Sequence, residues 1–186
     1  MNSGIRNNPA HAMKTENPAR PPCNIIVAGL GGQGVLTATD LLAETARRAG
    51  FDVKKSEIKG MSQRGGSVAC DVRFGLQIHS PMVPAGEADF LLALEPAQVE
   101  PNRHLLRPGG VTIGPWMIDA DQLPQKKALN VALLGALSVH LPMAEPEWLE
   151  ALGAAFAPQF LEANRRAFLL GRASQDKKNG STAQSP

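Results

Sequence analysis

The sequence predicts a three-layer α/β/α fold built on a mostly parallel, mixed sheet. The first observation is an apolar run at 25–28 that breaks into a glycine-rich turn at 29–34, before an amphipathic stretch. A strand that ends in G-x-G-x-x-G and opens a helix brings backbone N–H groups close to a phosphate. The second is a continuous apolar run at 88–94, typical of a strand covered on both faces. The third is period-two alternation from Ser67, which indicates antiparallel pairing. Together they predict a Rossmann-like domain.

Length and composition suit a single domain. The chain has 186 residues, of which 43% are hydrophobic, so a full core can form. We expect that domain at 23–172, between a disordered N-terminal extension at 1–22 and a disordered tail at 173–186, because both ends are polar or rich in proline. The N-terminal stretch has no apolar signal region and no later run is long enough to span a membrane. We therefore expect a cytoplasmic protein without a membrane partner.

The first predicted unit is strand, turn, helix and strand. Apolar residues at three- and four-residue steps predict a helix at 35–49, which Gly50 ends. A strand at 52–58 would complete a parallel βαβ unit with a right-handed crossover. Alternation over 67–74, followed by Gly75, predicts an antiparallel hairpin with 76–79.

The second half supplies more strands and helices. A helix that is apolar almost all round, at 130–141, would be buried against the sheet or in a subunit contact. The other expected elements are a strand at 88–94, a helix that begins at Pro96 and is stopped by the Pro108–Gly110 turn, a strand at 111–113, and helices at 146–156 and 159–170.

The residues alone leave open the roles of two candidate binding residues near the glycine turn. A dinucleotide site needs an acidic residue about 20 residues after the turn to hold a ribose. Glu57 has that spacing, but lysines surround it, which favours the alternative of a solvated glutamate. The loop at 60–66 contains Arg64, which either binds a carboxylate or phosphate or is an exposed loop arginine.

No self-sufficient catalytic centre is evident. The sequence contains no G-x-S-x-G elbow, no H-E-x-x-H motif and no paired Cys/His spacing. The two cysteines, Cys23 and Cys70, are far apart and form no C-x-x-C pair. The single histidines are expected to be structural or solvent-facing. Basic residues do not cluster and the net charge is only +2, so we expect no nucleic-acid partner.

Several motifs occur together and in order. They are G-L-G-G-Q-G-V-L-T-A (29–38), S-E-I-K-G-M-S-Q-R-G-G-S-V (56–68), D-V-R (71–73), S-P (80–81), A-D-F-L-L-A-L-E-P (88–96) and N-V-A-L-L-G-A-L (130–137). This pattern resembles the gamma-domain family of the 2-oxoacid:ferredoxin oxidoreductases, and within it the beta subunits of indolepyruvate ferredoxin oxidoreductase. The pairing of the glycine turn with S-Q-R-G-G is more specific than either motif alone.

The resemblance implies a role in CoA-dependent oxidative decarboxylation of a 2-oxoacid, such as indolepyruvate or another aryl pyruvate. Enzymes of this family use thiamine diphosphate and iron–sulfur clusters and pass electrons to ferredoxin. This chain lacks the G-D-G…N-N thiamine pattern and cysteine clusters. The resemblance therefore implies that thiamine diphosphate and [4Fe-4S] belong to a larger catalytic alpha subunit, and that coenzyme A (CoA) is the ligand this chain could contact.

The resemblance also places the functional surface on two loops. The matching residues are Gly29, Gly31, Gly32, Gln33 and Gly34 in the first loop, and Gln63, Arg64 and Gly65 in the second. Both loops are expected at the carboxyl edge of the sheet, where α/β folds bind ligands. Contact with CoA, with another nucleotide or only with the partner subunit stays open. The segment 113–130 is shorter than in family members, which predicts a missing or reduced strand or interface loop.

Two rival hypotheses remain. A free-standing nucleotide-binding or regulatory module would use the glycine turn without a partner. A nicotinamide-dependent dehydrogenase acting alone is disfavoured, because no acid or base residue lies in a recognisable site and Gln33 would be unexplained.

Overall fold

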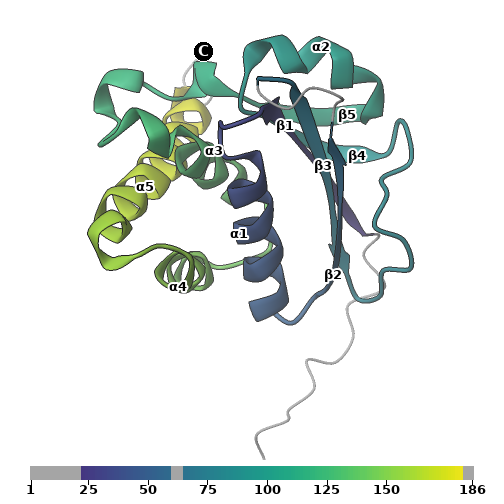
Figure 1. Cartoon of the computed structure of the whole chain (residues 1–186), viewed down its shortest axis with the longest axis horizontal. Helices are drawn as coiled ribbons and strands as arrows, with labels where there is room; N and C mark the ends of the chain where they lie inside the picture. The colour runs from purple at the N-terminus through teal and green to yellow at the C-terminus, as the bar shows by residue number, and fades with distance from the viewer. Residues whose placement is uncertain (1–21, 60–64, 182–186) are drawn as a thin grey trace, which may run out of the picture.

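The centre of the molecule is a five-stranded mixed sheet with the strand order β2-β3-β1-β4-β5. The computed structural model describes residues 22–59 and 65–181 (Figure 1). β1 pairs in parallel with β4, which pairs in parallel with β5, whereas β3 is antiparallel to both β1 and β2. The mixed sheet is as predicted. Its strands are β1 (Cys23–Leu30), β2 (Asp52–Lys59), β3 (Ser67–Gly75), β4 (Ala88–Ala93) and β5 (Leu106–Ile113).

The predicted hairpin partner of β3 was wrong. β3 pairs with β2 on one side and β1 on the other, while residues 76–79 form no strand. Ile78 instead buries its side chain, and its N–H donates to Oδ2 of Asp52 at 2.7 Å. The alternation over 67–74 identified the strand correctly, but alternation does not say which neighbour a strand chooses. As a result, the two strands of the predicted βαβ unit run parallel but are separated by β3.

Helices cover the two faces of the sheet unequally (Figure 1). α1 (Val35–Arg48), α3 (Leu129–Ser138), α4 (Glu145–Ala155) and α5 (Pro158–Ser181) lie on one face and enclose the larger core. The other face carries a smaller apolar cluster under α2 (Val99–Asn102), its flanking 3₁₀ turns and the segment around Val83. The predicted three-layer arrangement is therefore present, with one thick and one thin helical layer.

Two element boundaries differ from the prediction because proline and glycine were taken as stop signals. Helical turns after β4 end at Leu105, and β5 begins at Leu106 and runs through Pro108. Edge strands tolerate proline, which has no N–H to contribute to a ladder. The register between β4 and β5 shifts at this point.

α5 extends to Ser181 instead of ending near Leu170. Residues 173–181, which we expected in a disordered tail, therefore lie in this helix, whereas 182–186 lie outside the described residues. The expected disordered extension at 1–22 likewise lies outside them, except for Pro22.

α3 is buried in the core of its own chain. Every residue from Asn130 to Ser138 is buried, and the helix packs against α5 and the sheet. Of the two predicted environments, core and subunit contact, the structure therefore places this helix in the core. Two glycines allow α3 and α5 to touch through their backbones. A Cβ on Gly171 would overlap the carbonyl oxygen of Ala132, and one on Gly135 would overlap that of Phe168.

The segment before α3 consists of short turns. Three 3₁₀ turns, Pro115–Met117, Ala120–Gln122 and Lys126–Ala128, connect β5 to α3 without a strand. They bring the last turn directly to the start of α3, where it borders the site described below.

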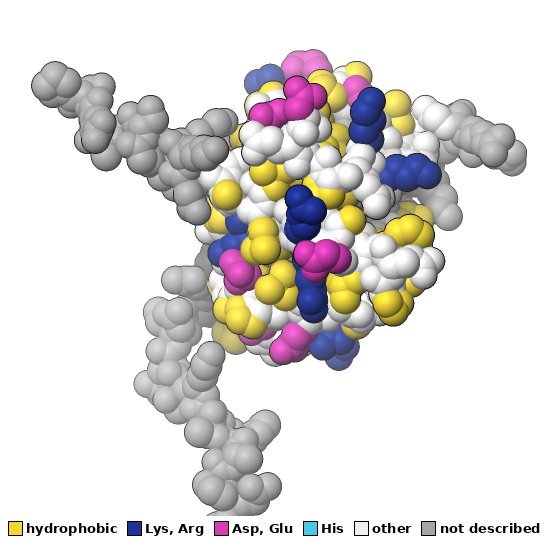
Figure 2. All heavy atoms as spheres, turned by 90° about the vertical axis from the view of Figure 1, so that its left-hand side faces the viewer, with side chains coloured by type: hydrophobic (Ala, Val, Ile, Leu, Met, Phe, Trp, Pro, Cys, Tyr) yellow, Lys and Arg dark blue, Asp and Glu magenta, His cyan; other side chains and the backbone are white. Residues whose placement is uncertain are grey.

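The surface formed by the helices carries interspersed charge. Lysine and arginine alternate with aspartate and glutamate and with apolar side chains over the face that Figure 2 shows. A nucleic-acid-binding face would gather basic side chains, and this one does not. None of the helices in the described part of the chain is long and apolar enough to cross a bilayer.

Candidate functional site

The two glycine loops meet at the end of β1. Because β2 runs parallel to β1, the loop that joins β2 to β3 arrives at the same edge of the sheet as the glycine turn. Gly31 N–H donates to the carbonyl of Gly66 at 2.9 Å. A Cβ on Gly31 would lie only 3.4 Å from the backbone nitrogen of Gly65. The structure thus brings together Gly31 and Gly65, which the sequence placed on one surface, whereas Gln63 and Arg64 lie outside the described residues.

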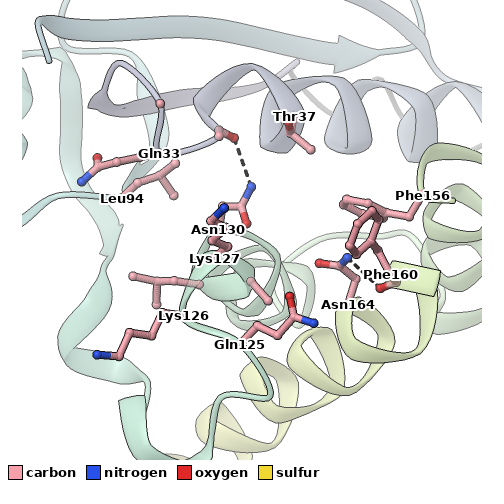
Figure 3. Close-up of a pocket in the computed structure, with 14 residues that line it drawn as sticks. Gln33, Thr37, Leu94, Gln125, Lys126, Lys127, Asn130, Phe156, Phe160 and Asn164 are labelled. Carbon is pink, nitrogen blue, oxygen red and sulfur yellow. Dashed lines mark hydrogen bonds between the residues drawn. The ribbon is translucent and has the colours of Figure 1, made fainter. Parts of the chain in front are cut away.

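Gly34 ends the first loop and starts α1. It has a φ of +82°, in the left-handed region that favours glycine. Its carbonyl accepts a hydrogen bond from Nδ2 of Asn130 at 3.3 Å (Figure 3). A Cβ on Gly34 would overlap that nitrogen and lie 3.2 Å from Cγ of Asn130. Conformation and space therefore both require glycine, and the start of α1 is fixed against the start of α3.

Asn130 was not singled out in the sequence. It lies in the N-V-A-L-L-G-A-L motif, where its polar side chain precedes a run of apolar residues. A buried asparagine at the start of an otherwise apolar helix was the signal that could have identified it, since buried amides are almost always hydrogen-bonded.

The Gln33 side chain points into the protein. Its Oε1 accepts from the N–H of Leu30 at 2.7 Å, and its Nε2 donates to Oε2 of Glu95 at 2.9 Å. The N–H of Gln33 also donates to the carbonyl of Leu30 at 3.1 Å, which closes a tight turn. Both ends of the carboxamide are thus occupied by the protein. Glu95, at the end of β4, is a second residue that the sequence analysis missed.

A cleft of about 590 Å³ opens beside the first glycine loop (Figure 3). Its walls come from the N-terminal ends of α1 and α3, from the turn before α3 and from the α4–α5 junction. The side chains on these walls are polar, basic and aromatic. They belong to Gln33, Thr37, Leu94, Gln125, Lys126, Lys127, Asn130, Phe156, Phe160 and Asn164.

The cleft has the electrostatics of an anion site. The first N–H groups of α1 have no partner within their helix, and each helix start carries a partial positive charge. At the start of α3, the N–H of Leu129 already donates to the carbonyl of Lys126, and the N–H of Val131 donates to Oδ1 of Asn130 at 2.9 Å. Lys126 and Lys127 are exposed beside them and form no ion pair with any residue in the described ranges. Among the residues that the structure describes, no acidic side chain lines the cleft. This arrangement favours a ligand with phosphate or carboxylate groups.

The opposite wall of the cleft is apolar. Phe156 and Phe160 come from the α4–α5 junction, and Phe160 has 49% of its surface exposed. Asn164 is tied back to α5, because its Nδ2 donates to the carbonyl of Phe160 at 2.9 Å. The cleft therefore suits a ligand with an anionic part and an apolar or aromatic part.

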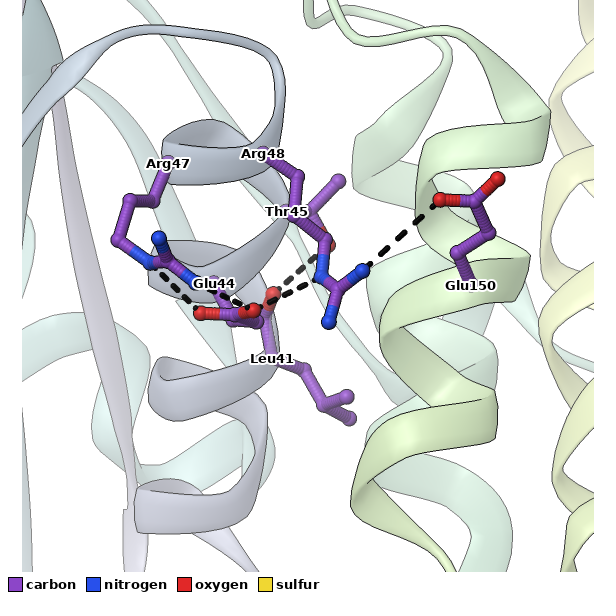
Figure 4. Close-up of polar contacts among 6 residues, drawn as sticks. All are labelled: Leu41, Glu44, Thr45, Arg47, Arg48 and Glu150. Atoms are coloured by element: carbon purple, nitrogen blue, oxygen red, sulfur yellow. Dashed lines mark hydrogen bonds and ion pairs between the residues drawn. The ribbon is translucent and has the colours of Figure 1, made fainter.

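A second hollow, between α1 and α4, has a different character. It measures about 420 Å³ and is lined by Asp40, Glu44 and alanines of α4. Glu44 already accepts hydrogen bonds from Arg47 and Arg48, and Arg48 approaches Glu150 of α4 at 3.9 Å (Figure 4). The arginine hydrogen bonds lower the pKa of Glu44. Its charge is neutralised within the protein, so this hollow offers little to a ligand.

The donor set of this chain does not fit a metal cluster. A [4Fe-4S] cluster takes four cysteine ligands, and the whole sequence has two cysteines. Burial raises the pKa of Cys23 to about 12, with the Asp89 charge adding to it. Burial also raises the pKa of Cys70. No group of three or more metal-binding side chains occurs within residues 22–59 and 65–181.

The other residues considered in the sequence, Glu57 and the histidines, are not among the described residues that line the cleft. Glu57 lies on β2, and β3 occupies the position next to β1 from which a Rossmann ribose ligand would come. His79 and His104 are exposed, while the His140 ring packs against Phe90 with centroids 5.8 Å apart. Burial lowers the pKa of His140.

Residues 24–174 match the family model described as pyruvate ferredoxin/flavodoxin oxidoreductase. The chain belongs to this family. It is 34% identical over 188 residues to indolepyruvate oxidoreductase subunit IorB of Thermococcus kodakarensis, covering 80% of this chain and 93% of that protein. It is 47% identical over 88 residues to subunit IorB of Pyrococcus horikoshii, but this match spans only 44% of that relative. The predicted family is therefore confirmed.

Solved structures of the family share the fold. The keto/oxoacid ferredoxin oxidoreductase gamma subunit of Geobacter sulfurreducens superposes with a TM-score of 0.71 at 23% identity, covering 85% of this chain and 98% of that one. The 2-oxoglutarate:ferredoxin oxidoreductase of Magnetococcus marinus gives a TM-score of 0.73 at 22% identity, covering 85% of this chain and 32% of that one. These matches confirm the predicted α/β architecture.

Proposed function

We propose that this chain is the accessory subunit of a ferredoxin oxidoreductase that acts on indolepyruvate or another aryl pyruvate in a CoA-dependent oxidative decarboxylation. A larger catalytic alpha subunit would hold thiamine diphosphate and [4Fe-4S] clusters and pass electrons to ferredoxin. Family membership and the match over 93% of an indolepyruvate oxidoreductase subunit support this assignment. The two cysteines of this chain are too few for a cluster of its own.

The cleft beside the glycine loops is the proposed place of contact with CoA. The observation that carries this proposal is the convergence of two helix starts and two lysines, which form no ion pair among the described residues, on a cleft whose described lining has no acidic side chain. CoA combines phosphate groups with an aromatic base, which fits the basic end and the phenylalanine wall. The Magnetococcus marinus relative was solved with 2-oxoglutarate, CoA and succinyl-CoA bound.

In this function the chain binds and orients, and the reacting bonds lie in the partner. Apart from the two lysines, the described residues of the cleft lining include no titratable side chain that could move a proton. Thiamine diphosphate supplies the carbanion chemistry when it is bound in the larger subunit. The described residues of this chain would hold the phosphate end of CoA and exclude water from the apolar wall. Gln63, Arg64 and Gly65 are proposed to complete the contact from the second loop.

Affinity purification of the tagged chain from its native cells without oxygen tests the assignment. We expect a large partner to co-purify, with broad absorbance at about 400 nm from thiolate-ligated clusters. The purified complex should reduce ferredoxin only when an aryl pyruvate and CoA are both present. A colourless chain that binds nucleotides without any partner would favour the rival hypothesis of a free-standing nucleotide-binding or regulatory module.

Charge reversal at the cleft tests the CoA contact. In the complex, Lys126→Glu and Lys127→Glu should each raise the KM for CoA about tenfold, the size of a lost hydrogen bond or ion pair with a charged group. Lys54→Glu is the matched control, because Lys54 lies on the outer strand β2 and does not line the cleft. The KM for the oxoacid should stay unchanged. Equal effects of all three substitutions would contradict a specific contact.

A further inference from the structure

Both glycine loops are anchored to one short segment, residues 94–98, which follows β4. The first loop is attached through Gln33, whose Nε2 donates to Oε2 of Glu95 at 2.9 Å. The exit of the second loop is attached through Ser67, whose hydroxyl donates to Oε1 of the buried Gln98. The N–H of Leu94 donates to the carbonyl of Ala28 at 2.7 Å, which continues the β1–β4 pairing to this point. Three separate hydrogen bonds thus connect this segment to the two loops and to β1.

Gln33 is the central residue of this arrangement. Its Oε1 caps the N–H of Leu30, the last residue of β1, at 2.7 Å while its Nε2 reaches Glu95. A Cβ on Gly29 would lie 3.0 Å from Gln33 Oε1 and 3.1 Å from Cβ of Leu94, so the glycine makes room for this side chain. A shorter or apolar side chain at position 33 would leave the half-buried N–H of Leu30 without this partner, which costs free energy.

We propose that the Gln33–Glu95 hydrogen bond is a positioning contact that holds the first glycine loop in its ligand-binding shape. Gln33 then acts through the backbone it fixes and does not touch the ligand with its carboxamide. The Gly31–Gly66 hydrogen bond transmits the same constraint to the second loop. This inference rests on the proposed function, because it assumes that the ligand of the glycine loop in the assembled enzyme is CoA.

The Gln33–Glu95 pair can be tested by placing a second carboxylate at position 33. Gln33→Glu places a second carboxylate against Glu95, and two carboxylates at hydrogen-bond distance repel unless they share a proton. In the assembled enzyme we expect the KM for CoA to rise about tenfold at pH 8, as for a lost hydrogen bond to a charged group. The kcat and the KM for the oxoacid should change less than about twofold, because no reacting group is affected.

The double variant Gln33→Glu/Glu95→Gln is the rescue. It restores a carboxylate–amide pair with the roles exchanged, so the KM for CoA should return to within about threefold of the wild-type value at pH 8. Gln122→Glu is the matched control, because Nε2 of Gln122 donates to Oδ2 of Asp119 at 2.7 Å in a turn outside the cleft. It creates the same kind of carboxylate pair and should leave the KM for CoA unchanged.

A measurement on the full chain separates this inference from the proposed function. In the ¹⁵N-labelled chain, Gln33→Met removes the acceptor of Leu30 N–H, so hydrogen exchange of that amide should accelerate at least about tenfold. If the wild-type complex shows no dependence on CoA, the proposed function fails, whereas the exchange rate still tests separately whether Gln33 holds the end of β1 in place. Unchanged exchange in Gln33→Met, or wild-type KM values for CoA in Gln33→Glu at pH 8, would overturn it. Failure of the double variant to recover would do the same.

Discussion

Replacing Gly171 by alanine should force α3 and α5 apart. The added Cβ would overlap the carbonyl oxygen of Ala132, lie 2.7 Å from its carbonyl carbon and lie 3.0 Å from the backbone nitrogen of Ala136. All three atoms are backbone, so no side chain can turn away to make room. Restoring ordinary contact distances requires the two helices to separate by roughly 1.5–2 Å, which forfeits at least about half of each affected dispersion contact.

The net effect can be estimated from two opposing contributions. Overpacking of a well-packed core costs about 1–3 kcal/mol, and a backbone clash belongs at the upper end of that range. Alanine in place of a helical glycine contributes about 1 kcal/mol in the opposite direction. We therefore expect Gly171→Ala to lower the free energy of unfolding by about 2 kcal/mol, and Tm by roughly 4–8 °C for a chain of this length.

Gly153→Ala is the matched control. Gly153 is exposed in α4, and the only atom within reach of an added Cβ is a guanidinium nitrogen of Arg165 at 3.8 Å. The same substitution should therefore raise the free energy of unfolding by about 1 kcal/mol. Urea unfolding followed by circular dichroism measures both variants. A Gly171→Ala chain as stable as Gly153→Ala would refute the proposed backbone contact between the helices.

Four further predictions concern the site and the core. Gly34→Ala should destabilise the chain by about 1–3 kcal/mol, because the new Cβ meets Asn130 and the φ at this position is positive. The same substitution should abolish tight CoA binding by the complex. Urea unfolding measures the loss of stability, and calorimetry measures the loss of CoA binding. Leu134→Asp should unfold the isolated chain, with loss of its circular dichroism signal, because Leu134 is 1% exposed; a folded variant that merely fails to assemble would contradict the core assignment. Since burial raises the pKa of Cys23 to about 12, iodoacetamide at about pH 8 should modify this thiol slowly until urea unfolds the chain, as mass spectrometry can follow. Arg64→Ala should raise the KM for CoA or the oxoacid in the complex, whereas unchanged kinetics would indicate an exposed loop arginine.

Local patterns predicted much of the fold. The apolar run before the glycine turn gave β1, helical spacing gave α1, and the continuous apolar stretch gave β4. These elements are determined by residues that are neighbours in sequence. The order of the strands in the sheet could not be predicted in this way. One neighbour of β3, the strand β1, is distant in sequence, and the alternation of residues in β3 is the same whichever strand it pairs with. The helix expected at 159–170 was ended too early for a related reason, since a glycine that contacts another helix, as Gly171 does, looks in sequence like one that ends its own helix.

The candidate site was predictable only in part. The glycine spacing located the first loop, and the resemblance paired this loop with the second one. The hydrogen bond from Gly31 to Gly66 agrees with that pairing. Lys126, Lys127 and Asn130 were not anticipated, because they are far along the chain and reach the cleft only when α3 packs beside α1. Gln33 was predicted on the functional surface, but its inward hydrogen bonds depend on Glu95, which sequence spacing does not connect to it.

The two outer strands limit how this subunit can join another protein. β2 and β5 each pair on one side only, so each has a row of backbone groups facing outwards. On β2 that border carries Lys54 and Lys55, which are paired with Asp52 and Asp40, and charged side chains on an edge strand disfavour the approach of a further strand. On β5 the proline at 108 and the shift in register interrupt the pattern that a further strand would need. Growth of the complex by continuing the sheet into a neighbouring chain is therefore disfavoured, and the larger subunit is expected to join through loops and helix surfaces.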